Sequence, residues 1–331
     1  MIEAGLIETD VQVLLATYNG EAYLREQIES ILAQTMPVSV LARDDGSRDG
    51  TVAILEEYAG RYPERFTLLP TGASTGSAKG NFLRLMEAAT AGYVAFADQD
   101  DVWAREKIAL EMSAMRGLEQ KHGVGGPLLV FSDLMLVDEE LKVLHKSMWK
   151  QQGIDAANIH RFARIVAQNV ATGCTELINR PLLQLAMKMP EDAFMHDWWI
   201  AMLASGFGAS ALVSEPTVFY RQHSHNVLSA VLHERPSGVP QWRNHAQRRE
   251  QWEMSVHQAE ALWRVHGGDL TAKKRDVLAA FLRCETHPNR VVRVFTWLTQ
   301  GFFLNGGLRA NLATLWYLWD MKVAKQTAAV V

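Results

Sequence analysis

A run of apolar residues that stops at three carboxylates constrains the fold of this chain more than any other stretch. Residues 92–97 are β-prone and show no helical spacing, which predicts a buried strand of a largely parallel sheet. Asp98, Asp100 and Asp101 follow directly. Carboxylates are costly to bury unpaired, so these three need solvent, a cationic partner or a metal ion.

The position of these carboxylates favours a metal. Open α/β sheets bind their ligands at the carboxyl ends of their strands, and a hard divalent cation prefers oxygen ligands. Asp98 and Asp100 have the spacing to hold Mg²⁺ or Mn²⁺ while substrate phosphates supply further oxygens. The alternative is a solvated acidic turn that caps a helix expected to start near Trp103, because acidic residues also favour helix N-termini.

Charge and cysteine content narrow the class of protein. A formal charge of -4 over 331 residues argues against nucleic acid as a partner. Cys174 and Cys284 are too far apart for a disulfide framework or a zinc site, which favours a reducing, cytoplasmic setting. The acidic stretch 1–10 does not resemble a signal peptide. No stretch is long and apolar enough for a confident membrane-spanning helix, and the nearest candidate, 291–319, is interrupted by polar residues.

Strand and helix patterns alternate along the first third of the chain. Strands are expected at 11–16, 38–42 and 66–69, and helices at 22–34, 51–62 and 81–90. This alternation predicts a doubly wound, mostly parallel α/β sheet. Because the carboxyl ends of parallel strands meet at one edge, three polar clusters are expected to share one cleft: 17–19, 44–45 and 98–101.

Three motifs, in this order and spacing, resemble the family 2 glycosyltransferases. They are Ala-Thr-Tyr-Asn-Gly at 16–20, Asp-Asp-Gly-Ser-Arg-Asp-Gly-Thr at 44–51 and Phe-Ala-Asp-Gln-Asp-Asp-Val-Trp at 96–103. The set is similar to the bacterial rhamnosyltransferase-like branch, which builds surface polysaccharides. The resemblance implies a GT-A fold, a nucleotide-sugar donor and a divalent metal, Mg²⁺ or Mn²⁺.

The resemblance also implies roles for residues of the donor half. Thr17, Tyr18 and Asn19 would lie at the nucleoside, with the Tyr18 ring stacked on the base, and Asp44 or Asp45 would accept a hydrogen bond from the base edge. Asp98 would contact the nucleotide as well as the metal. Ordinary packing for Tyr18 and a tight turn at 45–47 are the alternatives.

Lys79, on the approach to the strand at 92–97, is a candidate for contacting the diphosphate, with a solvated surface lysine as the alternative. Asn81 is expected to be a helix N-cap. Further on, residues 218–227 resemble the segment that closes over the diphosphate and metal in the same branch. His223 in that segment is a candidate metal or phosphate ligand, against an exposed loop histidine.

The stretch Met-His-Asp-Trp-Trp at 195–199 matches an acidic motif of the acceptor half. By resemblance Asp197 is the general base, which takes the proton of the acceptor hydroxyl as that oxygen attacks the anomeric carbon. His196, Trp198 and Trp199 are candidate acceptor-binding residues. The alternatives are a helix N-cap for Asp197 and core packing for the tryptophans. Cys174, in the segment 171–175 that resembles the glycine-containing part of this half, is expected to be structural.

The last third is predicted to be helical, at 241–266, 271–285 and from 288 on. It is locally basic and carries several tryptophans and phenylalanines, which suits an anionic membrane surface, while packing on the catalytic domain or a second subunit fits equally well. The localisation expected is cytoplasmic, with peripheral contact to the cytoplasmic face of the membrane left open. The predicted domains are 1–235, with halves 1–122 and 123–235, and a helical region 236–331.

The function predicted from these residues is an inverting, metal-dependent transfer of a sugar to a glycan or lipid-linked acceptor. The donor implied by resemblance is dTDP-L-rhamnose, with UDP-linked sugars as the nearest alternative. A nucleotide-sugar-binding protein without turnover is the rival class, which the presence of both Asp100 and Asp197 disfavours. A nucleotidyltransferase would need a basic triphosphate loop near the N-terminus, and residues 16–20 contain no Lys or Arg.

Overall fold

The computed structural model describes residues 11–155, 160–223, 245–305 and 307–321. These residues fall into two compact units. Unit 1 takes in the chain up to Met148, Ala171–Met187 and Gly208–His223; unit 2 takes in Trp149–Val170, Lys188–Phe207 and the described residues from 245 on. Positions 224–227 of the segment singled out at 218–227 lie outside the described residues.

The first half of the unit 1 sheet is parallel. Its strands are β1 (Val11–Thr17), β2 (Ser39–Asp44), β3 (Phe66–Leu68) and β4 (Tyr93–Ala97), and they pair in the order β3-β2-β1-β4. All of β1 is buried, as its continuous apolar run predicts. The crossovers contain α1 (Leu24–Leu32), α2 (Thr51–Arg61) and α3 (Ala78–Ala88).

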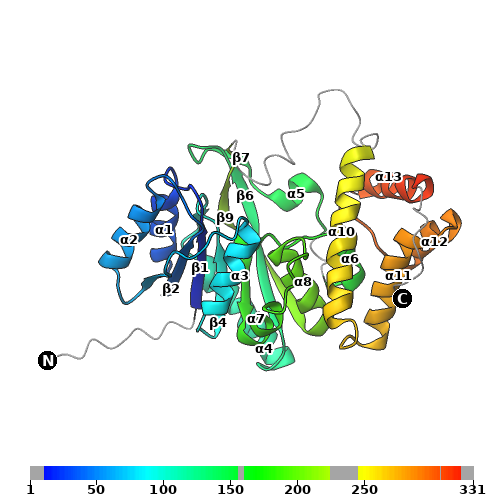
Figure 1. The fold of residues 1–331 in the computed structure, drawn as a ribbon, viewed down its shortest axis with the longest axis horizontal. Helices are drawn as coiled ribbons and strands as arrows, with labels where there is room; N and C mark the ends of the chain where they lie inside the picture. The colour runs from blue at the N-terminus through cyan, green and yellow to red at the C-terminus, as the bar shows by residue number, and fades with distance from the viewer. Residues whose placement is uncertain (1–10, 156–159, 224–244, 306, 322–331) are drawn as a thin grey trace. The chain divides into compact units, whose positions relative to one another are not determined.

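The order of these strands decides which sheet face each helix covers. The chain steps outward from β1 to β3 and then returns to β4, so right-handed crossovers place α1 and α2 on one face and α3 on the other. Figure 1 shows this arrangement, with α1 and α2 on one side of β1 and β2 and α3 on the other.

The second half of the sheet is mixed. β8 (Glu176–Asn179) lies antiparallel between β4 and β6 (Leu128–Val137), and β9 (Ala209–Arg221) runs parallel to β6. The short β5 (Val102–Trp103) and β7 (Val143–His145) pair antiparallel with β9 and β6. α4 (Lys107–His122) packs on β6 and β9, and α7 (Arg180–Ala186) follows β8. The predicted GT-A architecture, with a sheet followed by a helical region, is confirmed.

Two predicted helix starts are wrong. The helix expected near Trp103 begins at Lys107, because Val102 and Trp103 pair with β9 instead. Asn81 is not an N-cap: α3 begins at Ala78, and the Ser77 hydroxyl accepts the capping bond from the Gly80 N–H at 3.1 Å.

Unit 2 is helical in the described residues. Its helices are α5 (Met148–Gln152, whose first residue belongs to unit 1), α6 (Phe162–Ala167), α8 (His196–Phe207), α10 (His245–His266), α11 (Ala272–Thr286), α12 (Arg290–Gln300) and α13 (Gly307–Asp320). α6 packs against α8, α10 and α11. A cluster of buried rings joins the C-terminal helices: Trp252, Phe281, Trp297 and Phe302. Among the described helices none is long and apolar enough to cross a membrane.

Candidate active site

The three polar clusters predicted to share one sheet edge lie together in unit 1. Thr17 and Asp44 are register partners at the ends of β1 and β2, and β1 pairs with β4 up to Leu15 and Ala97, just before Asp98. The Asp45 N–H donates to the Thr17 carbonyl at 2.9 Å. The prediction that this edge gathers the clusters is confirmed.

Asp44 is held by the turn that follows it. Its buried carboxylate accepts hydrogen bonds from the Thr17 hydroxyl at 3.0 Å and from the N–H groups of Gly46 and Ser47 at 2.9 and 2.8 Å. The Ser47 hydroxyl adds a short fourth bond. Both oxygens therefore have partners within the chain. The role of Asp44 at a nucleoside base stays a prediction, and such a contact would have to share or displace one of these bonds.

Asp45 anchors the loop at 73–76. Its carboxylate accepts from the Thr75 N–H at 2.7 Å, the Gly76 N–H at 3.0 Å and the Arg43 guanidinium at 2.8 Å. Burial alone would raise the pKa of this carboxyl, but the hydrogen bonds from Thr75, Arg43 and Ser74 outweigh it and hold the pKa below its usual value. Asp45 is therefore an ionised anchor.

Arg43 and Asn81 connect the segments that meet at this edge of the sheet. The sequence patterns did not single out Arg43. The Arg43 guanidinium also donates to the Asn81 Oδ1 at 2.7 Å and to the Ala73 carbonyl at 3.0 Å. The buried Asn81 amide donates to the main-chain oxygens of Thr17 and Arg43, both at 3.2 Å. Asn81 thus ties α3 to the ends of β1 and β2.

Tyr18 stands at the surface of the edge. Its side chain is 55% exposed, so the ring is available to stack on a base. Its backbone exchanges two hydrogen bonds with Gln99, whose side chain crosses so close to Gly20 that a Cβ there would lie 2.3 Å from the Gln99 Oε1. A side chain at position 20 would therefore force the Gln99 amide to move.

Asn19 and Lys79 flank the same edge. Asn19 adopts a left-handed φ of 50°, and its exposed side chain accepts from the Arg48 N–H at 2.9 Å. Lys79 lies half-buried in the first turn of α3. The nucleotide and diphosphate contacts predicted for these two residues remain predictions.

The residues after β4 separate into two groups. Asp98, Asp101 and Cys174 each offer one ligand atom, and these atoms lie within 4.8 Å of one another. Cys174 comes from the 3-10 turn at Gly173–Thr175, and burial raises the pKa of its thiol well above the usual value. Cys174 is buried, while its structural role stays a prediction, and no sequence pattern indicated its place beside the carboxylates.

Asp101 is completely buried. Desolvation, followed by the charges of Asp100 and Asp98, raises the pKa of its carboxyl well above the ordinary value. Oδ1 accepts from the Arg221 N–H at 3.3 Å, while Oδ2 has no hydrogen-bond partner among the described residues. A buried orphan oxygen beside two further ligand groups is a site at which a cation would be stabilised.

Asp100 and His223, both predicted metal ligands, contact each other. The His223 Nε2 lies 2.8 Å from the Asp100 Oδ2, and the imidazole packs against the Tyr23 ring at 5.1 Å between centroids. Both side chains are largely sheltered from solvent. The alternative of an exposed loop histidine is therefore wrong.

Asp197 lies in unit 2, as the second residue of α8, and is half-buried. Its Oδ1 accepts from the adjacent Trp198 N–H at 2.6 Å. Because α8 begins at His196, Asp197 is inside the helix and is not its N-cap. The general-base role assigned by resemblance stays a prediction.

The three candidate acceptor-binding residues are buried in unit 2. His196 is 5% exposed, and burial lowers the pKa of its imidazole to about 3. The Trp198 indole donates to the Ile165 carbonyl at 2.6 Å, and the fully buried Trp199 packs against His266. Buried rings cannot stack on a sugar unless the unit opens, so the packing interpretation explains His196, Trp198 and Trp199 better.

With this geometry established, comparison with known sequences identifies the domain. The profile of the family described as Glycosyl transferase family 2 matches residues 12–133, which run from β1 into β6. Residues 12–133 are a family 2 glycosyl transferase domain. The predicted resemblance is confirmed, and the enzyme class is that of a glycosyltransferase.

Two curated relatives extend the family 2 match beyond this domain. The chain is 29% identical over 228 residues to the dTDP-rhamnosyl transferase RfbG of Shigella flexneri, covering 65% of this chain and 74% of RfbG. It is 26% identical over 225 residues to the putative teichuronic acid biosynthesis glycosyltransferase TuaG of Bacillus subtilis, covering 66% and 81%. The name of RfbG refers to dTDP-rhamnosyl transfer, and the name of TuaG refers to teichuronic acid biosynthesis.

A solved structure shares the fold. TarS 1-349 of S. aureus, in complex with UDP-GlcNAc, superposes with a TM-score of 0.55 at 17% identity, covering 88% of this chain and 80% of TarS 1-349. At this identity the likeness concerns the fold alone. It agrees with the GT-A architecture of the glycosyl transferase domain.

Proposed function

We propose that this family 2 glycosyltransferase is an inverting, metal-dependent enzyme that transfers L-rhamnose from dTDP-L-rhamnose to a glycan or lipid-linked acceptor in surface polysaccharide synthesis. The observation that carries the proposal is the single edge of unit 1 at which exposed Tyr18 stands beside Asp98 and Asp100. The name of the relative RfbG, a dTDP-rhamnosyl transferase, supports the choice of donor.

The donor half is proposed to hold the nucleotide through the first two strand ends. The Tyr18 ring, 55% exposed, would stack on thymine, and the rigid turns around Asp44 and Asp45 would keep that ring in place. Stacking on an aromatic ring tolerates different bases because every base offers a π-face. Tyr18 therefore favours a nucleoside without selecting which one.

The metal is proposed to lie among the carboxylates after β4. Hard divalent cations prefer oxygen ligands, and the orphan Oδ2 of Asp101 meets the Asp98 and Cys174 ligand atoms within 4.8 Å. Asp98, Asp100 and His223 remain the residues proposed to hold Mg²⁺ or Mn²⁺. The buried Asp101 is proposed to stabilise the cation from the protein interior. A bound cation would neutralise negative charge on the leaving diphosphate.

Asp197 is proposed to be the general base. An acceptor hydroxyl must lose its proton as it attacks the anomeric carbon opposite the departing nucleoside diphosphate, and a carboxylate within reach can take that proton. The Trp198 N–H donates to the Asp197 Oδ1 at 2.6 Å, which fixes the direction of that carboxylate oxygen. Inversion of configuration follows from a single displacement.

The test is a donor screen. We would measure binding and slow hydrolysis of dTDP-L-rhamnose, UDP-glucose, UDP-GlcNAc and GDP-mannose, with and without Mn²⁺, for the wild type and for Asp100→Ala and Asp197→Ala. We expect dTDP-L-rhamnose to bind only with metal, Asp100→Ala to lose that binding, and Asp197→Ala to bind without turnover. Equal binding of every donor with or without metal would contradict the proposal.

A UDP-linked sugar is the second candidate donor. The shared fold of TarS, solved with UDP-GlcNAc, is the observation that favours it. Preferential binding of a UDP-sugar in the same screen would replace the rhamnosyl assignment while leaving the roles of Asp100 and Asp197 intact.

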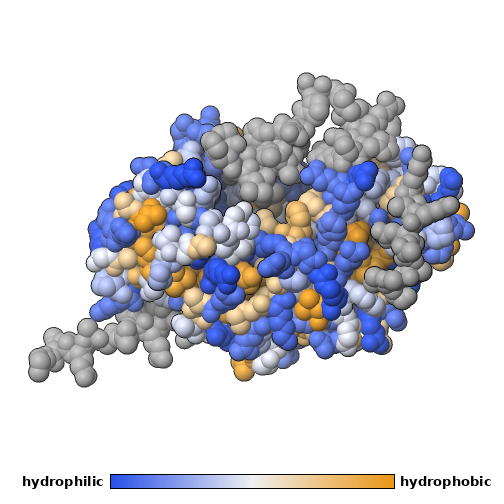
Figure 2. Space-filling model, in the orientation of Figure 1, coloured by the Kyte–Doolittle hydropathy of each residue, from blue (hydrophilic) through white to orange (hydrophobic). Residues whose placement is uncertain are grey.

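We also propose that α12 and α13 contact an anionic membrane surface. Their outward faces carry large apolar side chains between 39% and 75% exposed, namely Val291, Val292, Phe295, Leu298, Leu308, Leu312, Trp316 and Trp319. Hydrophobic atoms reach the surface among hydrophilic ones in Figure 2. The Arg290 guanidinium stacks over the Trp319 ring at 5.2 Å, which places a cation beside these apolar side chains. Apolar, aromatic and basic groups on one helical hairpin match an interfacial lipid-binding element.

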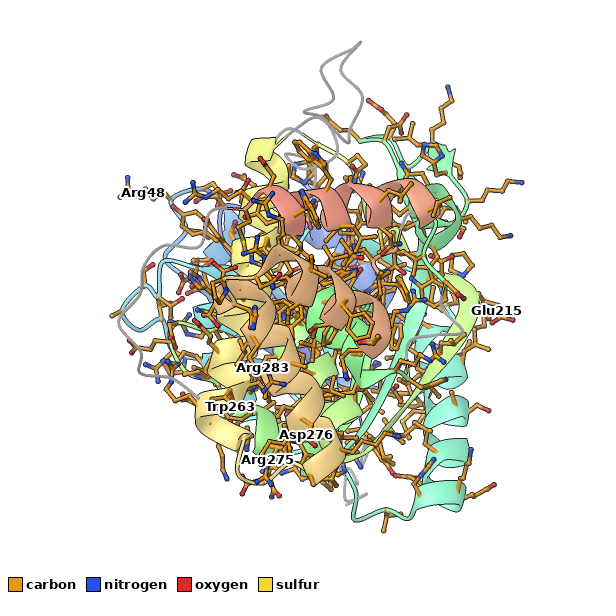
Figure 3. All side chains as sticks on the ribbon, turned by 90° about the vertical axis from the view of Figure 1, so that its right-hand side faces the viewer. Arg48, Glu215, Trp263, Arg275, Asp276 and Arg283 are labelled. Carbon is orange, nitrogen blue, oxygen red and sulfur yellow. The ribbon has the colours of Figure 1, made fainter. Side chains whose placement is uncertain are left out.

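Neighbouring cations extend this basic character. Figure 3 looks onto α11, α12 and α13 and labels Arg275 and Arg283 on α11.

The membrane contact is tested by sedimentation with vesicles of phosphatidylglycerol and phosphatidylcholine, comparing the wild type with Phe295→Glu/Trp316→Glu. We expect vesicle binding that the double variant loses and that salt weakens. A concentration-dependent dimer without vesicle binding would assign the face to a second copy instead.

A further inference from the structure

We propose that Arg221 is a positioning residue that fixes the loop carrying Asp98, Asp100 and Asp101. The inference rests on the proposed metal-dependent function. Arg221 is the last residue of β9, far along the chain from this loop, and it lies outside residues 12–133, which the family profile matches. Its side chain is only 2% exposed.

The Arg221 guanidinium joins three segments. Nε donates to the Asp100 carbonyl at 3.0 Å, and the two terminal nitrogens donate to the Glu139 carbonyl and to the Glu26 carboxylate of α1, both at short range. The guanidinium also lies over the Tyr23 ring, 4.4 Å from its centroid. A planar fork with donors in fixed directions can serve all three acceptors at once, which a lysine ammonium on a flexible stem cannot do.

The Arg221 backbone and His223 also contact the loop that carries Asp98, Asp100 and Asp101. The Arg221 N–H donates to the Asp101 Oδ1 at 3.3 Å, and His223, two residues on, contacts the Asp100 Oδ2 at 2.8 Å. The end of β9 therefore holds Asp100 by its main chain and by its side chain, and holds Asp101 by one carboxylate oxygen. The Tyr23 ring packs against both Arg221 and His223.

These contacts fix where the carboxylates point. Without the arginine, the Asp100 carbonyl would lose its buried donor and the loop could rotate, which would move both carboxylates that follow Asp98. Groups that orient metal ligands from behind change metal affinity by about 10- to 100-fold when they are mutated. Arg221 is therefore expected to act on metal affinity rather than on the chemical step.

The experiment compares Arg221→Lys and Arg221→Met with the wild type and with a matched control, Arg25→Met. Arg25 also pairs a carboxylate in unit 1, Glu57, but at an exposed position on α1 away from the loop. The affinity for Mn²⁺, in the presence of dTDP, is measured from the electron paramagnetic resonance signal of free Mn²⁺. The metal dependence of turnover is measured in parallel, together with the melting temperature.

We expect both Arg221 variants to bind Mn²⁺ about 10- to 100-fold more weakly and to need correspondingly more Mn²⁺ for half-maximal rate, while kcat at saturating Mn²⁺ changes much less. Arg25→Met should bind Mn²⁺ as the wild type does. A lowered melting temperature with unchanged Mn²⁺ affinity would overturn the inference, because a merely structural role predicts that result.

The two proposals fail in different ways. If the wild type binds no Mn²⁺ at all, the metal assignment falls and the inference falls with it. If the wild type binds Mn²⁺ and the folded Arg221 variants bind it equally well, only the inference falls. Should both Arg221 variants fail to fold, Glu26→Gln supplies the measurement, because the Glu26 side chain is 58% exposed and its charge pairs with Arg221. Unchanged Mn²⁺ affinity in that variant overturns the inference as well.

Discussion

Gln99 and Tyr18 exchange two hydrogen bonds between separate strand ends. The Tyr18 N–H donates to the Gln99 Oε1 at 2.7 Å, and the Gln99 Nε2 donates to the Tyr18 carbonyl at 2.9 Å. An amide satisfies both partners because it is donor and acceptor at once. The pair couples the proposed nucleoside platform to the loop of Asp98 and Asp100.

Gln99→Glu should therefore weaken nucleotide binding without unfolding the protein. A carboxylate still accepts from the Tyr18 N–H but repels its carbonyl, so the backbone beneath the Tyr18 ring is displaced. We expect a severalfold higher KM for the donor, measured by initial rates, and Gln300→Glu at the exposed end of α12 as a neutral control. An unchanged KM would show that the ring does not depend on this pair.

Asn81→Ala should destabilise unit 1. The substitution removes the amide that donates to the Thr17 and Arg43 carbonyls and leaves the Arg43 guanidinium short of one acceptor. Leaving buried polar groups unsatisfied costs about 1–3 kcal/mol each. Urea unfolding should report a lower free energy of unfolding by about this amount. A loss below a few tenths of a kcal/mol would mean that water replaces the amide.

Asp197→Asn should lower kcat by about 10²- to 10⁴-fold with little change in the KM of the donor, because an amide cannot take the acceptor's proton. Asp192→Asn is the matched control: Asp192 is exposed, lies in the same unit and pairs with Arg264. If both variants keep wild-type kcat, Asp197 is not the base, and its bond to the Trp198 N–H is then structural.

Acid should destabilise unit 2 through His196. Burial lowers the pKa of this imidazole from 6.5 to about 3, so below pH 6.5 the unfolded chain takes up a proton that the folded chain does not. The stability linked to neutral His196 is full above pH 6.5 and falls as the pH drops toward 3. Between pH 7 and pH 5 the loss approaches about 2 kcal/mol.

The measurement for His196 is urea unfolding of the wild type and His196→Leu at both pH values. The stability of the wild type relative to the variant should decrease between pH 7 and pH 5, because leucine does not titrate. A constant difference would contradict the low pKa.

Part of this fold could be predicted from the local pattern of apolar and polar residues. β1, β2 and β4 follow from short apolar runs, and their shared polar edge follows from the rule that parallel strands end together. The errors arose where a distant segment decides the outcome. Val102 and Trp103 form a strand because β9 pairs with them. Asn81 lies inside α3 because Ser77 caps that helix, which leaves the Asn81 side chain to bind Arg43 and Thr17.

In the site, too, some residues could be identified from local motifs, whereas others reach it only through contacts between distant parts of the chain. Family resemblance made Asp100 and His223 candidate metal ligands without predicting that they contact each other, and Cys174 and Arg221 reach the carboxylates through contacts that no spacing reveals. For His196, Trp198 and Trp199 the sequence left acceptor binding and core packing open, because an aromatic pair at a helix start has the same pattern whether it faces solvent or the core. The structure shows all three side chains buried.

The antiparallel β8 strand has a consequence for synthesis on the ribosome. Residues 176–179 fill the gap between β4 and β6, so the edge of β4 stays open until the chain beyond 179 has emerged. An open strand edge is a template for unwanted pairing. The nascent domain must therefore be shielded, or must wait, for the whole time that it takes to translate the 79 residues from Asp101 to Asn179, and a truncation at residue 133 should aggregate rather than fold.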